Sequence, residues 1–229
     1  MIERHITVSR VARYYTLGPP AIDAAEVWFV LHGYRQLAGR FLKRFEGLDD
    51  GTRRIVAPEA LSRFYVDDGS GPHGPGSRVG ATWMTREDRE REITDYVAYL
   101  DAVAARELAG GRRVAGTARI VVLGFSQGTA TASRWAVYGT TEADDLVLWA
   151  GLLAHDLDRE RAAARLRGTR VRFVAGGGDR FRNDAALAEQ VAWLEASGID
   201  CRRLDYDGGH RVDAVALDRL AQGLSSNAR

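Results

Sequence analysis

Apolar residues in this chain fall into short runs that alternate with longer stretches of helical spacing. Two runs, residues 27–31 and 120–123, are apolar at every position, which is typical of parallel strands buried on both faces. Further β-rich runs lie at 54–56, 118–123, 145–149, 171–175 and 201–206. Residues 6–17 alternate well enough to predict one long strand or a hairpin.

Helical stripes separate these runs. Apolar residues recur at spacings of three and four in four stretches: 37–45, 93–104, 187–194 and 212–224. Residues 129–138 and 159–166 indicate two further helices. Strands that alternate with helices through short links predict an α/β fold with a doubly wound, mostly parallel sheet and helices on both faces. We expect a single domain over residues 1–229, with an irregular Gly/Pro-rich loop at 67–79 and a frayed tail at 225–229.

Composition narrows the environment and the partners. The chain has 229 residues, with 32 Lys and Arg against 31 Asp and Glu, so its formal net charge is +1. This balance gives no electrostatic reason to expect nucleic acid or an anionic membrane as partner. Cys201 is the one cysteine, the N-terminus lacks the apolar segment of a secretory signal, and no apolar run approaches the roughly 20 residues of a spanning helix. We therefore expect a soluble, cytoplasmic protein without stable membrane insertion, and leave a homodimer open.

A candidate nucleophile lies between the run at 118–123 and the helix at 129–138. The segment Gly124-Phe125-Ser126-Gln127-Gly128 matches Gly-x-Ser-x-Gly, the motif of a sharp strand-to-helix turn that exposes a serine hydroxyl. The glycines leave room where a Cβ would collide with neighbouring strands. The N-terminus of the following helix directs N–H groups and a positive dipole end toward a developing oxyanion. The alternative is a glycine-rich turn with an incidental serine.

A serine nucleophile needs a base. In proteins with this turn, the serine comes first in the chain, then the acid, and then the histidine that acts as base. His210 follows the last β-rich run and two glycines, so its loop can return over Ser126. His155 is the other histidine downstream, and we interpret it as a surface or capping residue.

The acid is expected at the end of the preceding strand. Asp179 follows the run at 171–175 and three glycines, where its carboxylate would orient His210. Asp184 is the runner-up and the better candidate for a helix cap. Asp207 lies only three residues before His210, which favours a turn role.

Two backbone N–H groups should form an oxyanion hole. One belongs to Gln127, directly after the serine, and the other to Tyr34, with Arg35 as the second choice, in the loop after residues 27–31. His32 in the same loop precedes Ser126 in the chain, so we interpret it as a structural histidine.

With these residues identified, the chain resembles the phospholipase/carboxylesterase family of α/β-hydrolases, small serine esterases related to acyl-protein thioesterases. The matching features are Leu31-His32-Gly33-Tyr34, Ala57-Pro58-Glu59, Trp83, the Gly-Phe-Ser-Gln-Gly turn, Asp179 and Gly209-His210. The resemblance implies the α/β-hydrolase fold without a large cap domain, a Ser126–Asp179–His210 triad, and ester hydrolysis with no metal or cofactor. Two positions depart from the family pattern: Arg35, and the three glycines before Asp179 in place of a His-Gly pair.

These observations predict a serine carboxylesterase acting on small to medium carboxylic esters through an acyl-enzyme on Ser126. Alternatives on the same triad are an acyl thioesterase and a peptidase or amidase, and a catalytically silent binding protein is the alternative from another class. The partner is a small-molecule ester, with no nucleic acid. Phe64, Tyr65 and Trp83 are candidates to line the substrate groove, with core packing as the alternative for each. The sequence shows no His-x-x-x-His or His-x-His spacing, so no metal is expected.

Overall fold

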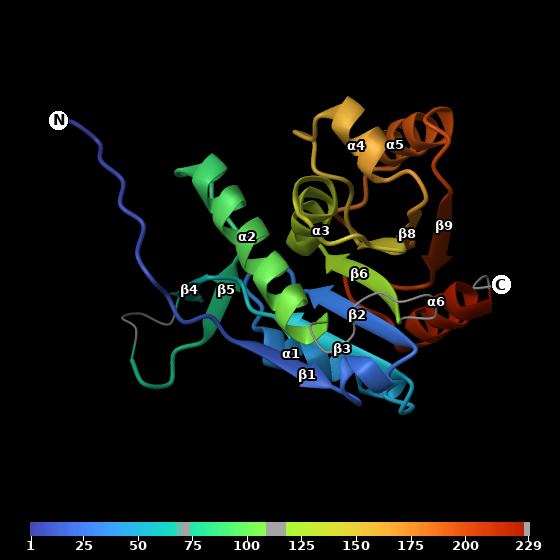
Figure 1. Ribbon diagram of the computed structural model, residues 1–229, viewed down its shortest axis with the longest axis horizontal. Helices are drawn as coiled ribbons and strands as arrows, with labels where there is room; N and C mark the ends of the chain where they lie inside the picture. The colour runs from blue at the N-terminus through green and yellow to red at the C-terminus, as the bar shows by residue number, and fades with distance from the viewer. Residues whose placement is uncertain (68, 70–73, 109–117, 227–229) are drawn as a thin grey trace.

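The computed structural model describes residues 1–67, 69, 74–108 and 118–226, and in them a seven-stranded sheet forms the centre of the molecule (Figure 1). The strand order is β1-β3-β2-β6-β7-β8-β9. β1 pairs antiparallel with β3, and all other neighbours are parallel. The strands are β1 (Tyr14–Leu17), β2 (Glu26–Leu31), β3 (Arg53–Pro58), β6 (Arg119–Phe125), β7 (Asp145–Trp149), β8 (Arg170–Gly176) and β9 (Cys201–Tyr206). The mostly parallel, doubly wound sheet expected from the sequence is therefore confirmed.

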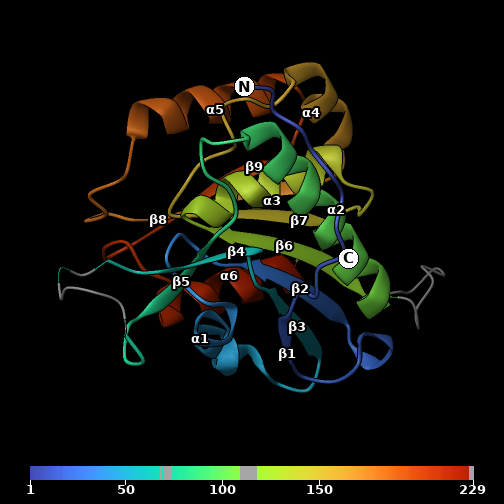
Figure 2. The ribbon, with the colours of Figure 1, turned by 90° about the vertical axis from the view of Figure 1, so that its left-hand side faces the viewer.

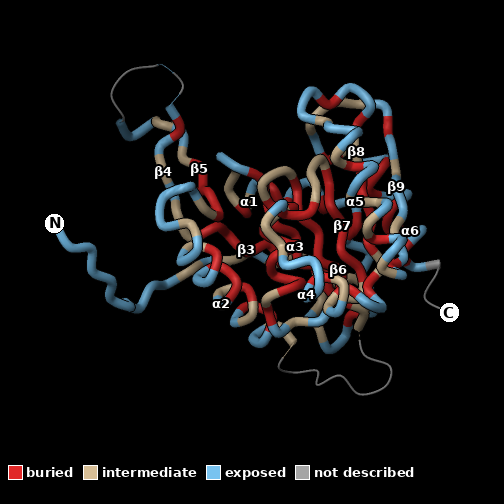
Figure 3. The backbone as a smooth tube through the Cα atoms, turned by 90° about the horizontal axis from the view of Figure 1, so that it is seen from above, coloured by how far each residue is buried: buried red, intermediate tan, exposed pale blue. Residues whose placement is uncertain are grey.

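Helices cover both faces of this sheet (Figure 2). One face carries α2 (Arg89–Leu108), α3 (Gln127–Tyr138), α4 (Arg159–Arg165) and α5 (Asp184–Ala196). The other carries α1 (Ala38–Leu42), the 3₁₀ helix η2 (Lys43–Leu48) and α6 (Ala214–Ser226), and a second short 3₁₀ helix, η1 (Ala21–Asp23), precedes β2. Side chains of β2 alternate between the two cores, Phe29 entering one and Trp28 the other. This double burial explains the uninterrupted apolar runs of the central strands (Figure 3).

The expected strand or hairpin at 6–17 is wrong for its first eight residues. Only Tyr14–Leu17 is a strand, and residues 1–11 are exposed. The described residues supply no second strand along 6–13, so the alternating pattern has no backbone partner there. A strand needs a neighbour for its N–H and C=O groups, and alternation alone does not provide one.

A separate two-stranded sheet was not predicted. β4 (Ser62–Tyr65) pairs antiparallel with β5 (Val79–Thr82), and residues 66–78 connect them. Val79, expected in the irregular loop, is the first residue of β5, while residues 68 and 70–73 of that loop lie outside the described residues. A single bridge between Gln36 and Ala81 joins this hairpin to the loop after β2.

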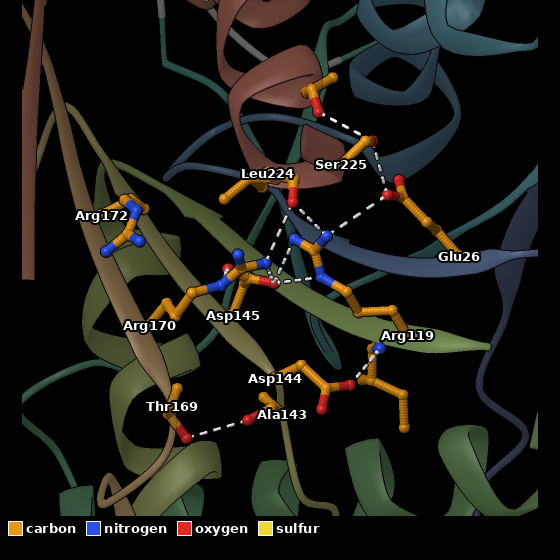
Figure 4. A network of polar contacts seen from close by, with 12 residues as sticks. Glu26, Arg119, Ala143, Asp144, Asp145, Thr169, Arg170, Arg172, Leu224 and Ser225 are labelled. Carbon is orange, nitrogen blue, oxygen red and sulfur yellow. Dashed lines mark hydrogen bonds and ion pairs between the residues drawn. The ribbon is translucent and has the colours of Figure 1, made fainter. Parts of the chain in front are cut away.

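The N-terminal ends of the parallel strands are joined by an ionic network (Figure 4). Asp145 on β7 has no exposed side-chain surface and binds Arg119 of β6 and Arg170 of β8, through Nε of each at 2.6 and 2.8 Å. Both arginines also donate to the carbonyl oxygen of Leu224 in α6. The network therefore ties three strands to the last turn of the last helix.

Helix α6 extends further than expected. It continues to Ser226, so the start of the predicted frayed tail is helical, and residues 227–229 lie outside the described part of the chain. The hydroxyl of Ser225 donates to Oε1 of Glu26 at 2.8 Å. Among the helices of the described segments, none has both the length and the apolar character needed to cross a bilayer.

Candidate active site

Ser126 lies at the turn from β6 into α3, at the C-terminal edge of the sheet. Its backbone has φ 53° and ψ −117°, a left-handed conformation that a non-glycine residue adopts only when its surroundings enforce it. Its N–H donates to the carbonyl oxygen of Trp149 at 2.9 Å, and the Thr129 hydroxyl donates to the Ser126 carbonyl at 2.7 Å. These two bonds hold the strained turn from both sides.

Glycines allow the backbones around this turn to touch. A Cβ on Gly124 would lie 2.1 Å from the carbonyl oxygen of Gly128, and a Cβ on Gly128 would lie 2.3 Å from that of Leu31. A Cβ on Gly33 would lie 3.2 Å from the Cβ of Ser126. The loop after β2 therefore packs directly on the serine turn, as the motif predicted.

The histidine and the carboxylate expected from the sequence meet the serine in one line of hydrogen bonds. Nε2 of His210 lies 2.9 Å from Oγ of Ser126, and Nδ1 lies 2.8 Å from Oδ2 of Asp179. The side chain of Asp179 is 2% exposed, and its other oxygen accepts the backbone N–H of Phe181 at 2.9 Å. With Nδ1 protonated, His210 donates to Asp179 and leaves Nε2 free to accept the serine proton.

The loops that carry the acid and the base pack on each other through backbone atoms. A Cβ on Gly176, where β8 ends, would lie 2.2 Å from the carbonyl oxygen of Gly208. The N–H of Gly178 donates to the same oxygen at 2.9 Å. This contact fixes the relative positions of the two loops, and hence of Asp179 and His210.

The backbone N–H groups of Tyr34 and Gln127, both near Ser126, have no hydrogen-bond partner among the described residues. In the loop after β2, the N–H of Gly33 donates to the side chain of Gln36 at 2.8 Å, and that of Arg35 donates to a carbonyl of β5 at 3.0 Å. Tyr34 lies between these two engaged groups. Since the N–H of Arg35 is already bonded, the geometry favours Tyr34, the first of the two predicted donors.

The Gln127 side chain connects the serine turn between β6 and α3 to the end of the β4–β5 hairpin. Its Nε2 donates to the Thr82 hydroxyl at 2.8 Å and to the Met84 carbonyl at 3.1 Å. Its Oε1 accepts the backbone N–H of Trp83 at 3.2 Å. Gln127, whose backbone N–H is unpaired among the described residues, is therefore held in place by its own side-chain amide.

His32 is fully buried and has the structural role that the sequence analysis preferred. Its Nδ1 lies 2.8 Å from the carbonyl oxygen of Gly33, and its Nε2 accepts the N–H of Ala60 at 3.1 Å. Burial lowers the pKa of His32 to about 4, against the hydrogen bond to Gly33 and the charge of Glu59, which both raise it. The ring therefore stays neutral and braces the loop that carries Tyr34.

The three aromatic residues proposed to line a groove have different surroundings. Phe64 stacks on Tyr34, with ring centroids 5.3 Å apart, and Tyr65 is 53% exposed. Trp83 is 2% exposed, packs on His32 and donates its indole N–H to the His32 carbonyl at 2.8 Å. Trp83 thus has the core position that was its alternative interpretation, because its ring packs on buried His32 in the loop after β2.

The other candidates for acid and base lie outside the line of hydrogen bonds from Ser126 through His210 to Asp179. Asp184 is the first residue of α5 and pairs with Arg182 at 2.8 Å; Asn183, not Asp184, caps that helix by accepting the N–H of Ala186. His155 and Asp207 are both exposed.

Phe181 is a site residue that the sequence analysis missed. It is 62% exposed, and its ring packs edge-on against His210 with centroids 4.9 Å apart and planes at 70°. No motif marks it. Its position two residues after the acid was the one available signal, since a residue so placed must lie near the histidine that the acid binds.

Glu3, His5 and Asp88 form the one cluster of metal-ligand type among the described residues, and all three are exposed. Nε2 of His5 lies 2.9 Å from Glu3 and 3.3 Å from Asp88. We interpret the group as surface ion pairs and assign no metal to it.

The fold is shared with known hydrolases. An acyl-protein thioesterase 2 from Zea mays superposes with a TM-score of 0.68 at 18% identity, over 95% of this chain and 99% of that one. A phospholipase/carboxylesterase from Dyadobacter fermentans gives 0.65 at 18% identity, over 94% and 97%. A Bacillus cereus carboxylesterase gives 0.65 at 15% identity, over 94% of each chain.

These similarities establish the α/β-hydrolase fold that the sequence motifs predicted. They do so at sequence identities below 25%. No protein-family model matches the chain, and no curated protein sequence matches it significantly.

Proposed function

We propose that the protein is a serine carboxylesterase that hydrolyses small to medium carboxylic esters through an acyl-enzyme on Ser126. The observation that carries this proposal is the line of hydrogen bonds from Ser126 through His210 to Asp179, next to two unpaired backbone N–H groups. Nucleophile, base, orienting acid and oxyanion donors are the parts that acyl transfer by serine requires. The esterases and thioesterases that share the fold support the same class of reaction.

Acylation would begin when Nε2 of His210 takes the proton of Ser126 Oγ as this oxygen attacks the ester carbonyl. Asp179 stabilises the imidazolium that forms and keeps the proton on Nδ1. The N–H groups of Tyr34 and Gln127 donate to the oxyanion, where donors that are already aimed need no reorganisation. The bond between the carbonyl carbon and the alcohol oxygen then breaks, and His210 passes its proton to the departing alcohol.

Deacylation would repeat these steps with water in place of serine. His210, now neutral, takes a proton from a water molecule that attacks the acyl-enzyme, and the same two N–H groups hold the second oxyanion. Collapse of this intermediate returns the proton to Ser126 and releases the carboxylic acid. Each step uses side chains and backbone groups of this chain alone.

A thioester is the second candidate substrate, favoured by the similarity to an acyl-protein thioesterase over 95% of this chain. Thioesters react through the same tetrahedral intermediate, but a thiolate departs with less need for protonation by the histidine. Matched oxygen and sulfur esters of one acyl group would rank the two.

Labelling by a fluorophosphonate tests the proposal most directly, because only an activated serine reacts quickly with this electrophile. We expect stoichiometric labelling of Ser126, and hydrolysis of p-nitrophenyl acetate that the label abolishes. Ser133, which is buried and donates to the Ala130 carbonyl, serves as the control serine. Absence of labelling in folded protein would contradict the proposal and favour a silent binding protein.

A further inference from the structure

A pocket lies beside the triad, between the C-terminal ends of β7 and β8 and the segment that follows Asp179. Its apolar walls are Ala150, Leu152, Phe173, Phe181 and Leu187. Gly151 also lines it, and a Cβ on this glycine would lie 3.1 Å from the carbonyl oxygen of Ser126. The pocket therefore starts at the serine turn.

Polar side chains on the pocket wall are already bonded within the protein. Asp179 accepts from His210 and from the N–H of Phe181. Asn183 caps α5, and Arg182 pairs with two aspartates, one at 2.8 Å and one at 2.9 Å. A ligand group in this pocket would find hydrocarbon surface and no free hydrogen-bonding side chain among them, so the pocket suits an apolar group.

Phe181 places this pocket on the side of the base. Its ring contacts His210, and its N–H bonds to the acid that orients His210. Of the two parts of an ester, the alcohol oxygen must come within hydrogen-bond distance of Nε2 of His210, which protonates it as it leaves. The alcohol group attached to that oxygen would then extend along Phe181. It would point away from the loop after β2, which lies on the other side of β6 and Ser126.

We propose that Phe181 and this pocket bind the alcohol part of the substrate and select small, apolar alcohols, branched or aromatic. This inference rests on the proposed esterase function. The exposed ring of Phe181 would be covered by the bound alcohol, and Leu152 and Leu187 would contact its far end. The guanidinium of Arg180 lies 4.7 Å from the centre of the Phe181 ring and contacts one face of it.

The test uses the fact that the alcohol has left before deacylation begins. Phe181→Ala is compared with wild type on methyl, propyl and benzyl acetate, which share one acyl group. We expect wild-type kcat/KM to rise along this series, and the variant to lose about tenfold on benzyl acetate and little on methyl acetate. The rate constant for hydrolysis of the acetyl-enzyme is the steady rate that follows the burst with p-nitrophenyl acetate. It should remain within about twofold of wild type.

Ile22→Ala is the matched control, because Ile22 is equally exposed, at 62%, and lies in η1 before the N-terminal end of β2. It should match wild type throughout. Phe181→Leu, which keeps an apolar side chain, should recover part of the benzyl preference. Slower deacylation in Phe181→Ala, or a loss that follows acyl length at fixed alcohol, would overturn the proposal. An unchanged alcohol preference would also overturn it while leaving a working esterase, whereas no labelling of Ser126 and no ester hydrolysis by wild type would overturn the proposed function as well.

Discussion

The two ends of the parallel strands differ in how far their polar groups are paired. At the N-terminal ends, Asp145 pairs with Arg119 and with Arg170 (Figure 4). Nearby Glu26 accepts hydrogen bonds from Trp28, Ser225 and Arg53. Burial alone would raise the pKa of Glu26, but these hydrogen bonds hold it below the ordinary value. At the C-terminal ends, Ser126 has a strained backbone and two N–H groups lack partners.

This contrast separates stability from chemistry along the same strands. Satisfied charges at one end stabilise the arrangement of strands and the last helix, while the other end keeps strain and unpaired donors where a reacting carbonyl would need them. Such strain persists only where the surrounding packing enforces it. Substitutions at the two ends should therefore change different measurements.

The largest expected effect is on activity at the C-terminal end. Ser126→Ala should lower kcat by a factor of about 10⁴ or more, since the nucleophile is lost, while the melting temperature stays close to that of wild type. Hydrolysis of p-nitrophenyl acetate and a thermal melt of the same preparation measure both. A tenth of wild-type kcat in the variant would remove Ser126 from the mechanism.

Asp179→Asn should lower kcat by a factor approaching about 10⁴, because the amide favours the wrong tautomer of His210. Asp184→Asn is the control. Its carboxylate is exposed and pairs with Arg182 and Arg203, so activity should stay near wild type. The reverse ranking would identify Asp184 as the acid.

At the N-terminal end the effect should be on stability. Asp145→Asn leaves two partly buried guanidinium groups without their carboxylate, which we expect to lower the free energy of unfolding by about 3 kcal/mol. The kcat of the folded fraction should not change. Urea unfolding gives the first quantity and ester hydrolysis at low temperature the second; a loss of kcat in folded protein would show that the two ends are coupled.

His32 predicts a pH dependence of stability that originates at the C-terminal end. Its pKa is about 4 in the folded protein and ordinarily 6.5, so below pH 6.5 the unfolded chain takes up a proton that the folded protein does not. Stability from this group is complete above pH 6.5 and falls as the pH drops toward 4, by about 3 kcal/mol in all.

Urea midpoints between pH 7 and pH 4.5, for wild type and for His32→Gln, measure this contribution. The glutamine can retain hydrogen bonds without titrating, so the variant should show a flatter pH dependence. Equal slopes would show that other groups cause the acid destabilisation.

The smallest expected effect concerns acyl length. We expect kcat/KM on soluble esters of one alcohol to rise from acetate to a medium chain and then fall, since each buried methylene contributes up to about 0.8 kcal/mol and the gain stops where the groove ends. A profile measured on monomeric esters from acetate to palmitate tests this. A steady rise to palmitate would indicate a deep tunnel.

Sequence patterns predicted the parts of this molecule that depend on local spacing. Continuous apolar runs identified β2 and β6 because burial on both faces leaves no polar position. The Gly-x-Ser-x-Gly turn and the order of acid and histidine identified the three residues that the hydrogen bonds join.

Features that depend on distant partners were missed. β4 and β5 are four residues each and pair across residues 66–78, so neither segment alone indicates a strand. The run at 6–17 shows the converse, a strand pattern with no neighbour over most of its length. Phe181 was also missed, because its importance comes from contact with a loop some thirty residues away.

Two glycines that pack backbone on backbone around the site should tolerate few amino-acid substitutions. Every missense codon reached from a glycine codon specifies a residue with a Cβ, and alanine is the mildest of them. At Gly128 and Gly176 that one carbon would lie 2.3 and 2.2 Å from the backbone oxygens of Leu31 and Gly208, which cannot rotate away as a side chain could. Selection should therefore reject substitutions at these two glycines as strictly as at Ser126, and a map of mutational tolerance would outline the architecture of the site as well as its chemistry.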